Sequence, residues 1–549
     1  MRALLVVLGL AMCGRALADP VFGNPPEVLL GNRLFDETRF AQFFAAHATG
    51  VNDTLAAGDP VMDATVTTTV ALPGPFVGQS MNCRACHLDV EQKGREGGGG
   101  RAYADFARRS PIPDRGDGQT LTVRNSQALL DANLARPGPF FLHFDGEFPS
   151  AQALVRATLT GRNFGWLPTE RAAAVAHIAR VIREDDGRGA LAQSFGGATY
   201  AGAFRGTDPL FPTNRPVPTS MTLDVAHASD EEIVDAIAAF MAAYMTSLVA
   251  ARDADGAFTA SPYDVFLAKN GLPRAPRARE SDMAYARRLG RLVDRLAAPA
   301  FVTEADGHFA LHPLPFVFGA EELAGLRLFL RRGHGRAAQP GTGNCVACHP
   351  PPVFTDFAFH ATGAAQDEYD AIHGDGAFAA LHIPDLAERN ADPAAYLPPS
   401  ASYPDAAGPF RAVPSAAQPG RTDLGLWNTF ANPDVPDASQ QAAMAQMICK
   451  ANAIAPCRRG RRQAARLLAG AVALFKTPSL RDLGHSAPYL HTGAQDTLDD
   501  VVAFYRRMGD LARAKRVRNG AKALAGVALR AEDVAPLAAF LRSLNEDFE

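Results

Sequence analysis

Two copies of one short motif combine a pair of thiols with an adjacent imidazole. They read Cys83-Arg-Ala-Cys86-His87 and Cys345-Val-Ala-Cys348-His349. In a Cys-x-x-Cys-His motif the two thiols form thioether bonds to haem, and the histidine binds the iron. We therefore predict two covalently attached c-type haems. The predicted attachment residues are Cys83, Cys86, Cys345 and Cys348, and the predicted proximal iron ligands are His87 and His349.

Two other interpretations of these cysteines fit the sequence less well. A thioredoxin-like redox pair explains neither His87 nor His349, and it normally lies in a βαβ unit. A zinc site would use both cysteine pairs, but about 260 residues separate them, which is far more than zinc sites usually span. The haem interpretation is the one that uses every residue of both motifs.

The N-terminus predicts export from the cytoplasm. Arg2 precedes a short apolar run over residues 3–12, and Ala16-Leu-Ala18 fits the small-x-small pattern of a cleavage site. These are the features of a secretory signal peptide, so we expect residues 1–18 to be removed and the mature periplasmic chain to begin at Asp19. A membrane-spanning helix needs about 20 apolar residues, a length that this run does not reach.

Composition and cysteine count fit an exported globular protein. The 549 residues are 47% hydrophobic and 20% charged, and this length predicts two or three domains. The net charge of −4 argues against nucleic-acid binding, which usually requires a basic face. Of the seven cysteines, Cys13 leaves with the signal peptide, four belong to the haem motifs, and Cys449 and Cys457 remain. In an oxidising compartment we expect this close pair to form a disulfide, the alternative being two free thiols.

Helical periodicity dominates the chain, so the predicted fold class is mostly α. Ser229 and Glu232 form a capping-box pattern ahead of apolar residues at helical spacing. Further helices are predicted over residues 171–183, 283–297, 321–331, 498–508 and 533–544. Strand-like alternation is rare. The glycine-rich residues 94–100 and the proline- and glycine-rich residues 361–420 indicate loops, and residues 362–470 are interpreted as a long loop-rich insertion.

The sequence that follows each haem motif repeats in the same order. Residues 124–130 are matched by residues 476–480, and Phe141-Leu-His143 is matched by Tyr489-Leu-His491. A glycine follows in both copies, with one extra residue before it in the first copy. The repeat predicts two copies of one haem-binding unit.

Several segments carry a recognisable family pattern. The most specific are Phe475-Lys-Thr-Pro-Ser-Leu-Arg-Asp482, Ala487-Pro-Tyr-Leu-His-Thr-Gly493 and Leu498-Asp-Asp-Val-Val-Ala-Phe-Tyr505. Weaker matches lie at residues 30–35, 261–264, 325–329, 344–349 and 354–363. Together these segments resemble the bacterial di-haem cytochrome c peroxidase/MauG family. The resemblance implies two cytochrome c-like haem domains in tandem, at residues 19–255 and 256–549, with the insertion in the second.

The resemblance also implies different tasks for the two haems. The N-terminal haem would reduce hydrogen peroxide, and the C-terminal haem would pass electrons to it from a small redox protein or a protein substrate. In MauG-like members a tyrosine fourteen residues after the turn histidine binds the second iron, and here Tyr505 stands fourteen residues after His491. Met508 is the substitute ligand, and a Tyr505 that merely faces the core is the alternative.

The corresponding position of the first repeat offers no iron ligand. It is Thr158, twelve residues after Gly146. Family members that need reductive activation carry a displaceable histidine soon after the first motif, but residues 88–142 contain none. The first haem is therefore expected to be open to peroxide. Two alternatives remain: an electron carrier without catalysis, in which His143 would be the sixth ligand, and an oxygen-using haem oxygenase.

Three departures from the family pattern affect the expected chemistry. Phe144 stands where the family has a tryptophan between the haems. Gln152 matches the family's distal glutamine, but no carboxylate takes the place of its distal glutamate. His143, Glu147 and Arg162 are the remaining candidates for general acid–base catalysis. The third departure is the insertion, which is expected to cover or reshape a surface used by partners.

The resemblance implies further roles in cofactor binding. His360 and His491 match family positions that contact haem propionates. The family also tends to hold a calcium ion between its domains, and Asn125 and Asp131 lie in the corresponding region. The expected cofactors are therefore two haems c and one calcium ion. Separately, no stable insertion of the chain into a membrane is expected.

Overall fold

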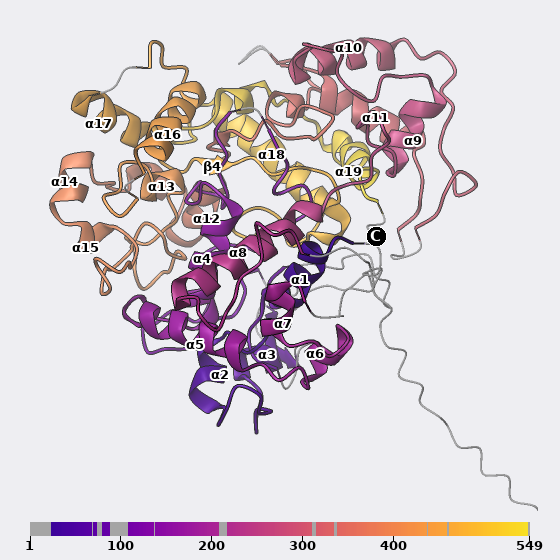
Figure 1. Cartoon of the computed structure of the whole chain (residues 1–549). Coiled ribbons are helices and arrows are strands. Elements are labelled where there is room, and N and C mark those ends of the chain that lie inside the picture. The colour runs from indigo at the N-terminus through magenta and orange to yellow at the C-terminus, as the bar shows by residue number, and fades with distance from the viewer. Residues whose placement is uncertain are drawn as a thin grey trace, which may run out of the picture.

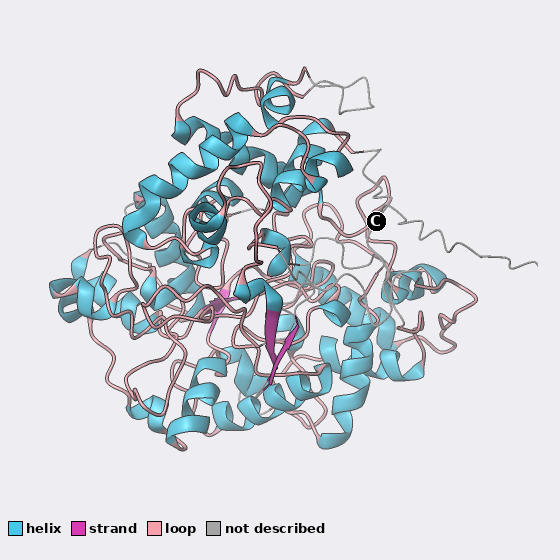
Figure 2. Ribbon diagram, turned by 90° about the horizontal axis from the view of Figure 1, so that it is seen from below, coloured by secondary structure: helices cyan, strands magenta, loops and turns pink. Residues whose placement is uncertain are grey.

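The computed structural model describes residues 24–67, 70–73, 79–87, 108–136, 138–207, 217–309, 314–333, 338–435, 437–457 and 460–546. The expected signal peptide, with Cys13, and the glycine-rich residues 94–100 lie outside these ranges. The described part consists mainly of helices joined by long loops, with two short antiparallel strand pairs (Figure 2). The predicted mostly α fold class is confirmed.

The N-terminal half builds one group of helices around a shared core. Its elements are α1 (Pro26–Phe35), α2 (Gln42–His47), α3 (Pro60–Asp63), β1 (Ala64–Thr67), β2 (Val70–Pro73), η2 (Cys83–Ala85), α4 (Ala151–Leu159), η4 (Arg162–Phe164), η5 (Pro168–Glu170), α5 (Arg171–Glu184), α6 (Ala190–Ser194), α7 (Tyr200–Arg205) and α8 (Asp230–Ser247). Leu34, Ile178 and Phe240 are fully buried where α1, α5 and α8 meet. Burial of such apolar side chains is the main force that holds the helices together.

The C-terminal half builds a second group around its own core. Outside the insertion its elements are α9 (Pro262–Lys269), α10 (Asp282–Asp294), α11 (Ala320–Leu330), η7 (Cys345–Ala347), β3 (Phe359–His360), β4 (Phe475–Lys476), η9 (Leu483–His485), α18 (Leu498–Arg513), η10 (Lys522–Gly526), η11 (Ala531–Asp533) and α19 (Val534–Arg542). Tyr263, Phe329 and Phe540 belong to this core. The strand β3 pairs with β4 and so brings the two ends of the insertion together.

Each half is closed by a helix crossing at a glycine. The helix α1 crosses α8 at Gly31, where an added Cβ would overlap the Phe240 carbonyl (Figure 1). The helix α11 crosses α19 at Gly325, where an added Cβ would overlap the Pro536 carbonyl. Only a residue without a side chain allows such a close approach of two backbones. Both halves therefore contain a pair of helices that pack closely across a glycine.

This crossing makes Gly325 sensitive to the smallest substitution. We expect Gly325→Ala to lower the free energy of unfolding by about 1–3 kcal/mol, because the added methyl group forces α11 and α19 apart. Gly290→Ala in α10 is the matched control, since its Cβ would lie at an ordinary 3.7 Å from the Leu330 Cβ. Thermal unfolding followed by circular dichroism compares the two variants, and equal melting temperatures would contradict the crossing.

The predicted helices are present, with small differences at their ends. The hydroxyl of Ser229 accepts a hydrogen bond from the Glu232 backbone N–H at 3.3 Å, and the Glu232 carboxylate accepts one from the Ser229 N–H at 2.7 Å. This is the predicted capping box of α8. The helices α5, α10, α11, α18 and α19 occupy the other predicted ranges, and α18 continues to Arg513.

The insertion is more helical than its composition predicts. It contains α12 (Ala364–His373), α13 (Ala377–Ala380), α14 (Leu386–Ala391), α15 (Pro393–Tyr396), η8 (Leu426–Asn428), α16 (Ala438–Ala451) and α17 (Arg461–Gly470), of which α14 to α17 form the orange group at one side of Figure 1. The loop prediction is wrong for residues 364–396. Its aspartates and glycines stand at helix ends, as at Asp385, whose side chain caps α14, and at Gly376, which precedes α13.

The insertion also has its own hydrophobic core, which reaches the first repeat. Trp427 is fully buried at its centre, and Phe141 and Phe144 of the first repeat belong to the same cluster. Cys449 in α16 forms a disulfide with Cys457. The insertion is thus a packed part of the molecule that contacts both repeats.

Candidate haem sites

The first Cys-x-x-Cys-His motif presents its histidine in the state that binds iron. The side chain of Asn82 caps η2 by accepting a hydrogen bond from the Ala85 N–H at 2.9 Å. His87 Nδ1 lies 2.9 Å from the Gln127 carbonyl oxygen, so that Nδ1 donates and Nε2 keeps its lone pair. Burial lowers the pKa of His87, which favours the neutral ring that a metal requires.

The second motif repeats this arrangement. His349 Nδ1 lies 2.8 Å from the Phe354 carbonyl oxygen. Burial lowers the pKa of His349 to about 4, although hydrogen bonds to the backbone, one of them at Pro478, act in the opposite direction. The Nε2 of His349 therefore also keeps a lone pair that can bind iron. All four cysteines of the two motifs are half-buried.

The turns that follow the motifs have the same geometry, and they correct the alignment made from sequence. The Leu142 N–H donates to the Phe148 carbonyl at 2.8 Å, as the Tyr489 N–H donates to the Gln495 carbonyl at 2.7 Å. In both turns the glycine N–H bonds to the carbonyl three residues earlier, that of His143 or Leu490. His143 is therefore equivalent to Leu490, not to His491 as the sequence repeat predicts.

Phe144 is accordingly the equivalent of His491, and neither copy has an extra residue. His143 has a φ of 61° and Leu490 a φ of 68°, so the left-handed backbone belongs to the turn and not to histidine. The next helix begins after the N-cap Ser150 in one copy and Thr497 in the other. In this register Thr158 remains the equivalent of Tyr505.

Tyr505 lies beside the second motif. Burial raises the pKa of its hydroxyl, and the charges of Cys348 and Cys345 raise it further, which places the phenol close to both thiols. Met508 is 1% exposed and packs in a small cluster with Phe504. In the first repeat, Thr158 offers no comparable side chain. The two sites therefore differ in the side chain that could serve as a sixth iron ligand: the second has Tyr505, and the first has Thr158.

His360 supplies a positive charge next to the second motif. Its Nε2 lies 2.9 Å from Asp356 Oδ2. Burial alone would lower the pKa of His360, but the hydrogen bond to Asp356 and the neighbouring Cys348 thiol outweigh it and raise the pKa to about 10. The contribution of the thiol disappears when Cys348 forms a thioether, whereas that of Asp356 remains. An imidazolium here can bind a haem propionate, the role that the resemblance implies.

His491 lies between the two repeats. Its ring stacks on Phe475 with 3.6 Å between centroids and meets Phe144 edge-on at 6.1 Å. Burial lowers the pKa of His491 to about 3, so the ring is neutral. Its Nε2 is buried and makes no hydrogen bond within the described residues. A buried polar atom without a partner is costly, so it points to a group that the protein alone does not provide.

Arg136 shows the same deficit and has a second cation, Lys476, beside it. Arg136 Nη2 and Lys476 Nζ both donate to the Phe141 carbonyl, at 3.0 and 3.2 Å. The Arg136 guanidinium lies over the rings of Phe140 and Phe357, and its Nε and Nη1 find no acceptor among the described residues. Burial, followed by the charge of Arg136, lowers the pKa of Lys476 to about 7. The pair fits an anion, and the carboxylates of haem are suited to it.

If Arg136 binds a haem propionate, we expect it to raise the reduction potential of that haem. Arg136→Met should lower that potential by on the order of 60 mV, which corresponds to about 1.4 kcal/mol for a one-electron couple. Removing a positive charge favours the oxidised, more positive haem. A spectroscopic redox titration measures both potentials, with Arg188→Met as the control because the Arg188 side chain is 87% exposed. Unchanged potentials for both haems would exclude the contact.

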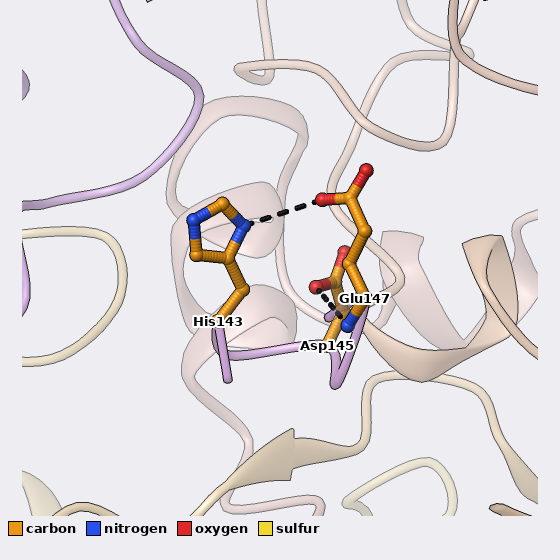
Figure 3. A group of neighbouring side chains, drawn as sticks. All are labelled: His143, Asp145 and Glu147. Atoms are coloured by element: carbon orange, nitrogen blue, oxygen red, sulfur yellow. Dashed lines mark hydrogen bonds and ion pairs between the residues drawn. The ribbon is translucent and has the colours of Figure 1, made fainter. Parts of the chain in front are cut away.

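Among the catalytic candidates, the structure brings His143 and Glu147 together. His143 Nδ1 lies 3.2 Å from Glu147 Oε2 (Figure 3). Burial would raise the pKa of Glu147, but the charge of Arg411 and the hydrogen bonds from His143 and Arg411 outweigh it and hold the pKa well below its usual range. The charge of His143 is also among the causes that lower the pKa of His87, after burial.

The other two catalytic candidates have different surroundings. Gln152 is exposed on α4. The Arg162 guanidinium is held by Asp117 through hydrogen bonds of 2.6 and 2.8 Å and also donates to the Gln119 carbonyl. The third guanidinium nitrogen of Arg162, Nη1, is buried without a partner among the described residues. Of the four acid–base candidates, His143 and Glu147 are the two that bond to each other.

The group of His143, Asp145 and Glu147 is not well suited to a metal ion. Their ligand atoms lie within 4.8 Å of one another. However, Arg124 Nη1 lies 2.8 Å from the Asp145 carboxylate and Arg411 Nη2 lies 2.6 Å from that of Glu147. Both carboxylates are thus already neutralised by arginine. Sequence reasoning gave no role to Arg124, which begins the repeat segment 124–130, or to Arg411, because each finds its partner through the fold.

Of the two calcium candidates, Asn125 has the suitable neighbours. Its Nδ2 lies 2.5 Å from the Pro488 carbonyl oxygen and 3.4 Å from that of Leu490. Turning the amide would direct Oδ1 toward these carbonyls and create the oxygen-rich donor set that calcium prefers. Asp131 instead pairs with Arg252 at 3.3 Å, so it is not suited to the ion.

Comparison with known proteins gives short matches in sequence. No protein-family model matches the chain. It is 40% identical to cytochrome-c peroxidase IdrP2 of Pseudomonas sp. (strain SCT) over 76 residues, which is 14% of this chain and 18% of that protein. It is 38% identical to cytochrome-c peroxidase IdrP1 of Denitromonas iodatirespirans over 71 residues, 13% of this chain and 18% of that protein. The matches thus span less than a fifth of the relatives, and part of the chain is similar to the family that its motifs resemble.

Comparison with solved structures gives long but loose overlaps. The crystal structure of the diheme peroxidase BthA from Burkholderia thailandensis E264 overlaps 95% of this chain and 86% of its own, with 18% identity and a TM-score of 0.42. A MauG-like protein associated with microbial copper homeostasis overlaps 95% of this chain and 90% of its own, with 15% identity and a TM-score of 0.41.

In the described part of the chain, none of the helices has the length and apolar character of a membrane span.

Proposed function

We propose that the chain is a periplasmic di-haem c-type oxidoreductase that reduces hydrogen peroxide at the N-terminal haem with electrons passed through the C-terminal haem. The observation that carries this proposal is the asymmetry of two otherwise equivalent sites. Both histidines, His87 and His349, keep Nε2 for an iron, but Thr158 stands where the second site has Tyr505. An iron with a free sixth position can bind peroxide, whereas a ligated one is suited to electron transfer.

We propose that this division of tasks rests on two cytochrome c-like domains in tandem, at residues 19–255 and 256–549. The first would contain the crossing of α1 with α8, and the second the crossing of α11 with α19. We place the boundary near residues 255 and 256, in the described loop between α8 and α9. Residues 1–18 would direct the chain to the periplasm, where haem attachment through cysteine takes place.

The haems, when bound, supply the iron that holds peroxide and carry the electrons. Side chains of the protein would transfer the proton. His143 Nε2 accepts the proton of the inner peroxide oxygen and returns it to the outer oxygen, which leaves as water. Glu147 holds Nδ1–H and stabilises the imidazolium that forms. Overall, one H₂O₂, two protons and two electrons give two molecules of water.

The neighbourhood of the second motif is suited to passing electrons. Tyr505 is the proposed sixth ligand, and its oxygen as tyrosinate would favour the oxidised iron. The stacked Phe475 and His491, with Phe144 beside them, fill the space between the repeats. A small redox protein or a protein substrate would supply the electrons.

The state of the first haem tests the proposal directly. The ferric protein should show a high-spin signal that changes within seconds after hydrogen peroxide is added, while the second haem is low-spin. Two low-spin haems that do not react with peroxide would instead support an electron carrier. One observation favours that alternative, because His143 is a histidine whose charge acts on the pKa of His87.

A further inference from the structure

We infer that the insertion at residues 362–470 is part of the peroxide site, because it supplies Arg411 as the positioning residue for Glu147 and His143. This inference rests on the proposed function. It assigns the insertion a role inside the molecule, in addition to any role at a partner surface.

Arg411 binds Glu147 through two hydrogen bonds. Its Nη2 donates to Glu147 Oε2 at 2.6 Å, and its Nη1 donates to Oε1 at 3.1 Å. The two-pronged contact of guanidinium with carboxylate fixes orientation as well as position. Because Oε2 also receives the hydrogen bond from His143 Nδ1 at 3.2 Å, the same contact determines where the imidazole lies.

Arg411 is itself held by a network of alternating charges. Asp145 is 0% exposed and lies 3.8 Å from Arg411 Nη2 and 2.8 Å from Arg124 Nη1. Arg124 in turn binds Asp423 of the insertion, with Nε 2.5 Å from Oδ2. Each charge therefore faces an opposite charge, so the arginine cannot easily move away from Glu147.

A second contact from the insertion fixes the backbone of the same turn. Gln440, in α16, donates from Nε2 to the Gly146 carbonyl at 3.1 Å and to the Glu147 carbonyl at 2.7 Å. The insertion thus holds both the main chain and the carboxylate of Glu147. The ring of His143 also meets Phe148 edge-on at 4.8 Å, which restricts it on a second side.

The second repeat serves as an internal control. At the positions of His143 and Glu147 it has Leu490 and Ala494, neither of which can transfer a proton. Of the two turns, the first carries a titratable pair, His143 and Glu147, and this is the turn to which the insertion supplies an arginine. This selectivity is expected of a device for peroxide chemistry and not of a general interface between repeats.

Replacing Arg411 in the full-length di-haem protein tests the inference. Arg411→Gln should slow the reaction of the first haem with hydrogen peroxide about 10-fold or more, with the spectrum of the second haem unchanged, because His143 is no longer held for proton transfer. Arg411→Lys should recover part of the rate. Arg421→Gln is the matched control, since Arg421 lies in the same insertion and its side chain contacts Gln418.

A double-mutant cycle separates positioning from general stability. In a His143→Ala background, Arg411→Gln should cause no further loss of rate, because the two residues act in one chain. Equal losses in both backgrounds would overturn the inference, as would an Arg411→Gln variant that reacts like the wild type. A wild-type first haem that is inert to peroxide would overturn the proposed function and this inference together. If Arg411→Gln fails to fold, Arg411→Lys provides the same comparison.

Discussion

Replacing His143 with alanine should slow the reaction of the first haem with hydrogen peroxide by about 100- to 10,000-fold, the usual contribution of a positioned acid–base group. Before the O–O bond can break, the proton on one peroxide oxygen must move to the other, which then leaves as water. In the structure, the charge of His143 acts on the pKa of His87, and Glu147 orients the His143 ring. Rapid mixing with stopped-flow absorbance measures the rate constant.

The control for this variant is His227→Ala, in the same half of the chain. The His227 side chain is 85% exposed and bonds to Asp224 at the surface. Its loss should leave the rate unchanged. If His143→Ala also reacts at the wild-type rate, another group transfers the proton. If His143→Ala changes the first haem from low-spin to high-spin, His143 is an iron ligand and the electron-carrier alternative is correct.

Replacing Tyr505 with methionine should have the largest effect on the second haem. We expect its reduction potential to rise by on the order of 100 mV or more, because a neutral thioether replaces an anionic oxygen and stabilises the reduced iron. The absorption spectrum of that haem should change with it. The first haem should keep its spectrum, since the groups whose charges act on the pKa of Tyr505 are Cys348 and Cys345 of the second motif.

Met508→Leu distinguishes the two candidate ligands on α18. Met508 packs in the small cluster that also contains Phe504. If Tyr505 is the ligand, Met508→Leu should leave the potential unchanged. A shift caused by Met508→Leu, together with none caused by Tyr505→Met, would move the assignment to Met508.

Much of the helical framework could be predicted because its signals are local. The capping box at Ser229 and Glu232 and the apolar spacing of α8 depend on residues close in sequence. The predicted fold class was correct for the same reason. The haem motifs are also local, since each places two thiols and a histidine within five residues.

The register of the repeat could not be obtained in this way. The sequence match paired His143 with His491 because the residue types agree. The hydrogen bonds of the turns pair His143 with Leu490, since backbone geometry and not side-chain identity defines the turn. When the two copies of a repeat diverge, the backbone hydrogen bonds of a turn are retained longer than its residue types.

The surroundings of the candidate site are equally non-local. Arg411 lies 264 positions from Glu147, and Arg124 lies 299 positions from Asp423. No spacing rule connects residues so far apart, and the composition around Arg411 predicted only loop. The fold alone brings them together, through the packing of the insertion on Phe141 and Phe144.

That packing has a consequence for the order in which the chain matures. The helix α8, which crosses α1 in the first half, ends at Ser247, so this half can fold before the later residues have emerged. Phe141 and Phe144, however, are covered by a cluster completed only with Phe475. Until that residue arrives, the nascent first half presents two aromatic side chains to water. A chaperone that binds exposed aromatic segments would therefore find its target during this interval and lose it once the whole chain has folded.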